Sequence, residues 1–146
     1  MKPSSRFALI RGRRDANDAA LSCIPPKLGV YVADTSGAGN GIPDKLLLTL
    51  IGVRDVACWC EIKDGSKPVS AQRLTDKEYE FFVRWFDRMR CAVVGNATQT
   101  ADMCLDLKSG MEVREFNLKW LAPALRDYRD AAKRRAERAE RKAMAR

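Results

Sequence analysis

The sequence predicts one α/β domain in which a mixed four-stranded sheet is flanked by helices and followed by a helical C-terminal extension. Two apolar runs, Ile42–Ile51 and Val56–Ile62, flank Gly52-Val53, a dipeptide suited to the tight turn of an antiparallel hairpin. A helix and another short strand follow, and a strand–helix–strand run implies a parallel crossover back onto the sheet. The expected order is therefore helix, three strands, helix, strand and helix.

The composition limits both the class of protein and its chemistry. With 146 residues, 46% of them hydrophobic, the chain is long enough for one core, and its net charge of +8 favours a polyanionic partner. We see no signal peptide, lipidation site or membrane-spanning run, so we expect a cytoplasmic protein with no membrane partner. The chain has no histidine, which excludes serine triads and histidine metal sites. Any chemistry must use carboxylates, lysine, hydroxyls and bound metals.

The five cysteines have the pattern of buried, reduced thiols. They stand among apolar neighbours and form no C-x-x-C pair, so we expect no zinc site. They are Cys23, Cys58, Cys60, Cys91 and Cys104.

The N-terminal part predicts one helix and one strand. We expect a polar surface segment over residues 1–12, a helix over Arg13–Ile24 that ends before Pro25-Pro26, and a strand over Gly29–Ala33. The helix would place Arg14 and Asp18 on one side. Its acidic residues are typical of an exposed helix start, and the alternative is that this side faces a functional site.

Asp34–Gly41 is a glycine-rich loop whose backbone could approach a phosphate backbone closely, which makes Asn40 a candidate nucleic-acid contact. The loop lacks the lysine and the spacing of a P-loop, so we expect no nucleotide cofactor. The alternative interpretation is a plain connection between strands.

The hairpin register brings charged residues together at one end of otherwise apolar strands. Counting outward from the turn places Asp44 opposite Glu61, and residues opposite each other share a face with Cβ atoms about 4.5–5.5 Å apart. Lys63 joins that face because strand side chains alternate, whereas a slip by one residue would move Asp44 to the other face. These charges form either an ordinary ion network at a strand end or a site for Mg²⁺ (or Mn²⁺) that acts on phosphodiesters.

Beyond the hairpin, the basic loop Asp64–Leu74 carries Lys67 and Arg73, and Thr75-x-x-Glu78 opens a helix as a capping box. The helix is amphipathic, with a core face at Tyr79, Phe82, Val83 and Phe86. A second apolar line, Phe81, Trp85 and Met89, is either part of a wide buried face or a surface for a second copy of the chain. A strand over Cys91–Gly95 and a helix over Thr98–Lys108, with Gly110 just past its end, complete the core.

The sequence changes character at Met111, so we divide the chain into a domain over residues 1–110 and a basic helical extension over 111–146. Beyond Tyr128 the extension is helix-prone but has no apolar face. It is either a solvated helix or an electrostatic arm for nucleic acid, in which Arg134 and Arg135 would contact phosphates. The side chains expected to dock its start on the core are Phe116, Trp120, Leu121, Leu125 and Tyr128.

The charged motif resembles a known family. Pro43-Asp44 and Glu61-Ile62-Lys63, with sixteen residues between the two carboxylates, resemble the PD-(D/E)xK nuclease signature. Further blocks resemble small phage and bacterial nucleases of the VRR-NUC and Holliday-junction-resolvase-like group, over about Arg13 to Leu105. These blocks are Arg13–Asp18, Gly41–Asp44, Glu61–Pro68 and Leu74-Thr75.

The resemblance implies a restriction-endonuclease-like core with the order αβββαβ and a Mg²⁺- or Mn²⁺-dependent DNA endonuclease. Its substrate is either a junction or other branched DNA, or a single strand or ordinary duplex. It implies that Asp44, Glu61 and the Ile62 carbonyl bind the metal, with Asp18 in place of the family's usual Glu. Lys63 would position the attacking water, and Glu78 stands where the family often has Gln. The implied location is the cytoplasm of a bacterium or of a phage-infected host.

The expected DNA contacts are Arg14, Asn40, Lys67, Arg73, Arg134 and Arg135. A homodimer through Phe81, Trp85 and Met89 would supply two active sites, one for each DNA strand. The alternatives are a non-catalytic nucleic-acid-binding protein that keeps the nuclease fold, and an adaptor protein that uses the Phe81–Trp85 face.

Overall fold

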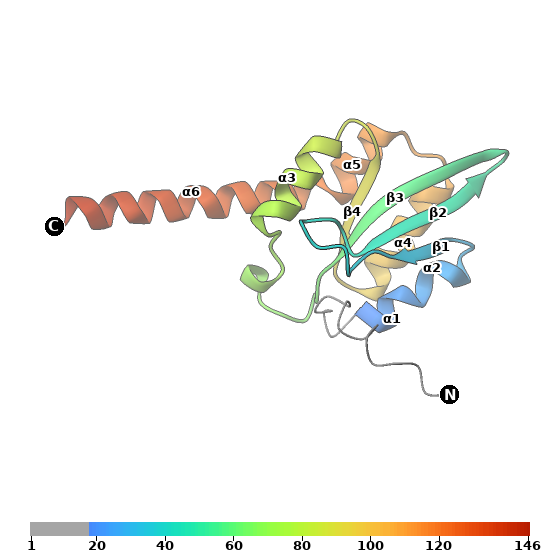
Figure 1. Cartoon of the computed structure of the whole chain (residues 1–146), viewed down its shortest axis with the longest axis horizontal. Coiled ribbons are helices and arrows are strands. Elements are labelled where there is room, and N and C mark those ends of the chain that lie inside the picture. The colour runs from blue at the N-terminus through green and yellow to red at the C-terminus, as the bar shows by residue number, and fades with distance from the viewer. Residues whose placement is uncertain (1–17) are drawn as a thin grey trace.

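The computed structural model describes residues 18–146 and is an α/β fold with one mixed four-stranded sheet, as the sequence predicts (Figure 1). The elements are α1 (Asp18–Ser22), α2 (Ile24–Lys27), β1 (Tyr31–Asp34), β2 (Lys45–Ile51), β3 (Arg54–Ile62), a 3₁₀ turn (Val69–Ala71), α3 (Asp76–Trp85), β4 (Arg90–Val94), α4 (Ala97–Lys108), α5 (Val113–Trp120) and α6 (Ala122–Met144). The expected segment 1–12 and the start of the first predicted helix lie outside the described residues.

The strands lie in the order β1-β2-β3-β4, with the first three antiparallel and β4 parallel to β3. The β2–β3 turn is Gly52-Val53, and Gly52 has a φ of 62°, a conformation that glycine adopts without strain. Pairing runs from Ile51 opposite Arg54 to Lys45 opposite Cys60. The register and the parallel crossover through α3 are therefore both confirmed.

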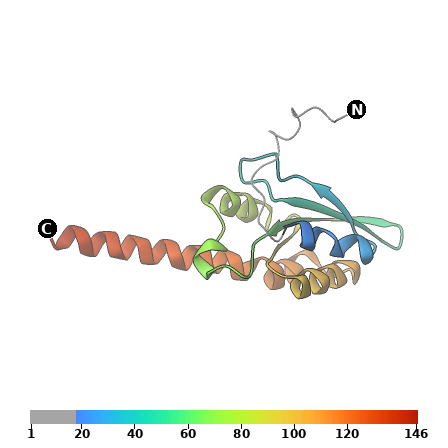
Figure 2. The same cartoon turned by 90° about the horizontal axis from the view of Figure 1, so that it is seen from below.

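Apolar side chains form a core on each face of the sheet. One core lies between the sheet and α1, α2 and α4 (Figure 2), with Leu47, Ile62 and Leu107 among its members. The other core joins the opposite face of β3 and β4 to α3 and the start of α6, through Phe82 and Leu121 among others. Four cysteines are buried as expected: Cys58, Cys60, Cys91 and Cys104. The prediction is wrong for Cys23, which is exposed in the connection between α1 and α2.

Three local predictions need correction. Pro25 and Pro26 lie in the first turn of α2, where the fixed φ of proline suits a helix start, and α1 ends before them, at Ser22. Strand β1 begins at Tyr31, because Gly29 has a φ of 76° and cannot be extended. Val83 is 48% exposed, because it lies about 100° around α3 from the buried Phe82.

The second apolar line predicted for this helix is half-buried within the chain, and its last member, Met89, lies beyond the end of α3 at Trp85. Phe81, Trp85 and Met89 pack against the second core, and the ring of Phe81 meets that of Trp59 edge-on at 5.5 Å. Packing inside one chain thus accounts for this line as part of a wide buried face. A second copy of the chain on this face stays a prediction.

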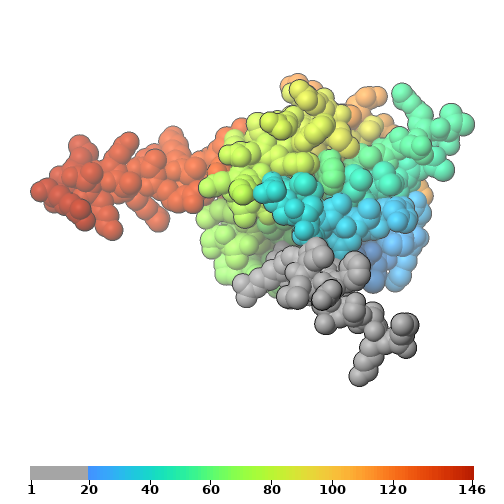
Figure 3. Space-filling model, in the orientation of Figure 1, coloured from blue at the N-terminus to red at the C-terminus, as the bar shows by residue number. Residues whose placement is uncertain are grey.

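The C-terminal extension packs on the domain at its start and then projects away from it as a rod (Figures 1 and 3). Phe116, Leu121 and Leu125 are buried, as expected of docking residues, and Ala131 is the last buried side chain of α6. Every residue from Lys133 to Arg146 is exposed. Within residues 18–146 we find no helix with the length and apolarity that crossing a membrane requires.

One buried amide ties the extension to the sheet. Asn117 of α5 is fully buried; its Nδ2 donates to the carbonyls of Phe86 (2.5 Å) and Met89 (2.8 Å), and its Oδ1 accepts from the Cys91 N–H (2.8 Å). It therefore satisfies three backbone groups where the chain passes from α3 into β4.

Replacing Asn117 by Leu should lower the free energy of unfolding by about 2–4 kcal/mol, because three buried backbone groups lose their partner. Chemical denaturation measures the loss. The control is Leu118→Ala on the same helix, which removes a side chain that is 52% exposed and should cost much less. Equal losses in the two variants would contradict the proposed role of the amide.

Candidate functional site

The paired ends of β2 and β3 hold two carboxylates together. The Asp44 N–H donates to Glu61 Oε2 at 3.1 Å, and the Ile62 N–H donates to Asp44 Oδ2 at 3.2 Å. Both acidic side chains line one pocket of about 550 Å³ beside the start of α3. The structure thus brings Asp44 and Glu61 together, as the register predicts.

Lys63 lies between two carboxylates. Its Nζ is 3.1 Å from Glu61 Oε1, and it is 3.1 and 3.0 Å from the two carboxylate oxygens of Glu78. Lys63 is not one of the residues that line the pocket of Asp44 and Glu61. It lines a neighbouring cavity of about 300 Å³, together with Gln72 and Trp120.

Glu78 has two functions in this arrangement. Its Oε2 accepts from the Thr75 N–H at 2.8 Å while the Thr75 hydroxyl accepts from the Glu78 N–H at 3.3 Å, so the predicted capping box is present. The same carboxylate pairs with Lys63. The sequence explains Glu78 fully by the cap, and only the three-dimensional position of Lys63 reveals the second function.

Burial and repulsion by acidic neighbours disfavour the ionised state of Glu61. Burial is the main cause that raises the pKa of Glu61 to about 9; Lys63 opposes it, while Glu78 and Asp44 raise it further. Burial also acts to lower the pKa of Lys63, but the neighbouring Glu61 and Glu78 outweigh it and raise that pKa. Lys63 is therefore a cation at neutral pH. Two acidic side chains contact it, and Asp44 lies beside Glu61, so three acidic groups share one cation.

The glycine-rich loop forms another wall of the pocket. Gly41 has a φ of 79°, and a Cβ placed on it would lie 2.3 Å from the Lys77 carbonyl oxygen. Glycine is thus required here for close approach of the loop to α3. Asn40, a predicted nucleic-acid contact, is exposed in the same loop with a φ of 56°.

The carboxylate oxygens of this site are of the kind that binds a hard cation, but only a few side chains supply them. Carboxylate oxygens are the ligands that Mg²⁺ takes, and it usually keeps several waters while binding one or two carboxylates. Among residues 18–146, no three acidic or cysteine side chains are placed to hold a metal ion. Asp44 and Glu61, which are hydrogen-bonded across the strand ends, offer two such groups to the pocket. The side chain of Asp18, the further predicted ligand, lies outside the described part.

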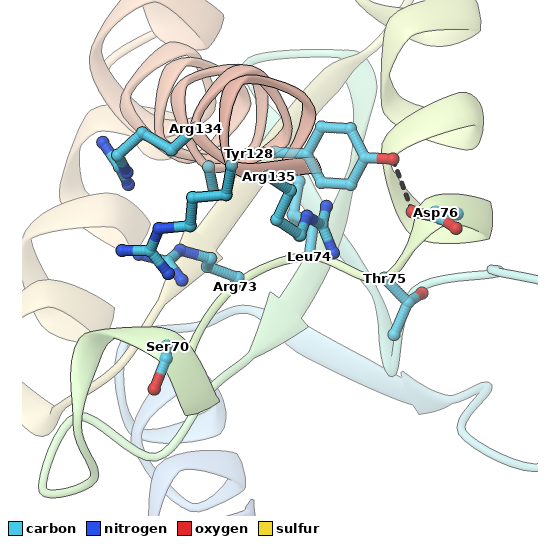
Figure 4. A pocket seen from close by; sticks show the side chains of 10 residues that line it. Ser70, Arg73, Leu74, Thr75, Asp76, Tyr128, Arg134 and Arg135 are labelled. Carbon is cyan, nitrogen blue, oxygen red and sulfur yellow. Dashed lines mark hydrogen bonds between the residues drawn. The ribbon is translucent and has the colours of Figure 1, made fainter. Parts of the chain in front are cut away.

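The remaining predicted DNA contacts that the structure describes lie in an exposed turn and in a second pocket. Lys67 is exposed in the turn after Asp64, and Arg14 lies outside the described residues. Arg73, Arg134 and Arg135 line one pocket between α6 and the segment that leads into α3 (Figure 4).

Comparisons of the chain with protein-family models, with curated proteins and with solved structures found no match. Membership of the nuclease family therefore stays a prediction.

We expect Glu61→Gln to flatten the pH dependence of stability in EDTA. The pKa of Glu61 is raised in the folded state, so the folded protein keeps a proton that the unfolded chain releases above its ordinary pKa of about 4.5. Stability is then lost as pH rises from about 4.5 to about 9, and the Tm of the variant should gain on that of the wild type across this range.

Asp55→Asn is the matched control, since Asp55 is an exposed carboxylate on the same face of β3. Its Tm should follow the wild type at every pH. Parallel curves for Glu61→Gln and the wild type would contradict the raised pKa of Glu61.

Proposed function

We propose that this chain is a restriction-endonuclease-like nuclease that cuts DNA in a Mg²⁺- or Mn²⁺-dependent reaction. One observation carries the proposal: Asp44, Glu61, Lys63 and Glu78 converge at the end of the β2–β3 pair, in the order and register of the PD-(D/E)xK motif. The element order from α1 to α4 is compatible with such a core. All four residues belong to one chain, so the site needs no second copy.

The surplus of acidic groups supports a cation site. Glu61 and Glu78 contact the one ammonium, Lys63, and Asp44 lies beside Glu61. The buried Glu61 is costly to ionise unless positive charge is added nearby. A divalent cation would supply the missing positive charge. Asp44 and Glu61 would hold it, with the Ile62 carbonyl that the family resemblance adds.

A bound Mg²⁺ would stabilise the negative charge that builds on the attacked phosphodiester and make a water molecule more nucleophilic. The protein's own groups prepare the site. The Ile62 N–H fixes the carboxylate of Asp44, and the Asp44 N–H fixes that of Glu61. Glu61 and Glu78 raise the pKa of Lys63, which favours a role as a hydrogen-bond donor that orients the attacking water and offsets negative charge over a role as a base.

Asp44→Asn and Lys63→Met should each reduce DNA cleavage in Mg²⁺ by about a hundredfold or more, because each removes a charge that the reaction needs. The measurement is a time course on labelled branched and linear DNAs, with Mg²⁺, Mn²⁺ or EDTA. Asp55→Asn is again the control and should cut like the wild type.

Two results would count against a metal-dependent nuclease: cleavage that continues in EDTA, and cleavage by Asp44→Asn at the wild-type rate. A wild-type protein that binds DNA but cuts none of the substrates with either metal would favour the alternative, a nucleic-acid-binding protein that keeps the fold. Circular dichroism must show that each variant is folded.

A further inference from the structure

Four arginines surround a second pocket, of about 500 Å³, outside the carboxylate site (Figure 4). Arg73 comes from the segment before α3, and the other three belong to α6: Arg134, Arg135 and Arg138. Asp76 is the one acidic residue among those that line it. The pocket is therefore strongly positive, whereas the carboxylate pocket is negative.

Side-chain contacts fix the walls of this pocket relative to each other. The Tyr128 hydroxyl donates to Asp76 Oδ1 at 2.5 Å, and the Tyr128 ring stacks on that of Tyr79 with centroids 4.1 Å apart. Arg73 Nε donates to Asp127 Oδ2 at 3.1 Å. These bonds hold α6 against α3 and against the segment before it, so the pocket is formed before any ligand arrives.

The charges of α6 are segregated around its axis. At 3.6 residues per turn, Arg134, Arg135 and Arg138 share the side that carries Tyr128 and Ala131, and Lys142 continues this side beyond the pocket. The opposite side carries the acidic residues of the projecting part together with other cations; these residues are Asp130, Glu137, Glu140, Arg126, Arg129 and Lys133. The pocket thus opens into a basic stripe along an exposed rod.

The two pockets share a wall. Thr75 and Asp76, at the start of α3, line both the arginine pocket and the pocket that contains Asp44 and Glu61. A ligand long enough to pass the start of α3 could therefore contact the arginines and the carboxylates at the same time.

We propose that the arginine pocket binds backbone phosphates of a nucleic acid and that the stripe on α6 follows the backbone away from it. Guanidinium groups bind phosphate oxygens through paired, charge-assisted hydrogen bonds, and several arginines in a row suit an anion that repeats. A single phosphate would not use Lys142. That the same strand reaches Asp44 and Glu61 rests on the proposed nuclease function; binding at the arginines does not.

The test compares two triple variants that remove the same charge from α6. The pocket variant removes the three α6 arginines that line the pocket: Arg134→Gln/Arg135→Gln/Arg138→Gln. The control variant removes three exposed cations on the opposite side of the helix: Arg126→Gln/Arg129→Gln/Lys133→Gln. Binding of a labelled duplex oligonucleotide, and of its single strand, is measured by fluorescence anisotropy in EDTA over a range of salt concentrations. EDTA separates binding from cleavage.

The pocket variant should bind at least about tenfold more weakly, and its plot of log K against log salt should be shallower by about 2–3, because each lost phosphate contact reduces counterion release. The control variant should stay within about threefold of the wild type. Equal weakening of both variants would show that binding depends only on the net charge of α6, and it would overturn the proposal. Unchanged binding by both variants would overturn it as well.

The two proposals can fail separately. If the pocket variant loses binding but the wild type never cuts DNA, the phosphate pocket stands and the nuclease function fails. If the wild type cuts DNA in Mg²⁺ and the pocket variant binds like its control, the nuclease function stands and the phosphate pocket fails.

Discussion

The register of the β2–β3 pair decides whether this chain has a site at all. The two strands pair without a bulge, from Ile51 opposite Arg54 to Lys45 opposite Cys60. A slip by one residue would turn Asp44 to the other face and at the same time expose side chains such as Leu47 that fill the first core. The apolar face of the strands therefore holds the charged end in place.

Helix α3 is the second constraint, because its first turn borders both pockets. Glu78 caps the helix through Thr75 and pairs with Lys63, so the local stability of the helix start and the position of the ammonium depend on one carboxylate. On the other side, Tyr128 ties the same turn to α6 through Asp76. The start of α3 thus links the acidic end of the sheet to the basic helix.

The sequence predicts what depends on spacing within one segment. The hairpin register, the capping box at Thr75 and the parallel position of β4 all follow from local patterns, and all are present. Contacts between distant segments could not be predicted in this way. The pairing of Glu78 with Lys63 spans the loop before α3, and the arginine pocket depends on how α6 is rotated as it leaves the domain. The exposure of Val83 has the same origin, since hydrophobicity alone does not say which side of α3 meets the core.

The two pockets carry opposite charges, one acidic and one basic, and this is the strongest physical reason to consider them together. The acidic groups of Asp44, Glu61 and Glu78 outnumber the one cation, Lys63, while the arginines of the second pocket outnumber its one acidic residue, Asp76. Asp127 pairs with Arg73, which leaves the three arginines of α6 in the second pocket, and Thr75 and Asp76 form the wall between the two pockets. A phosphodiester strand that carries a divalent cation offers positive charge to the first pocket and negative charge to the second. Of the ligand classes that a basic, histidine-free chain can attract, this one balances both pockets at once.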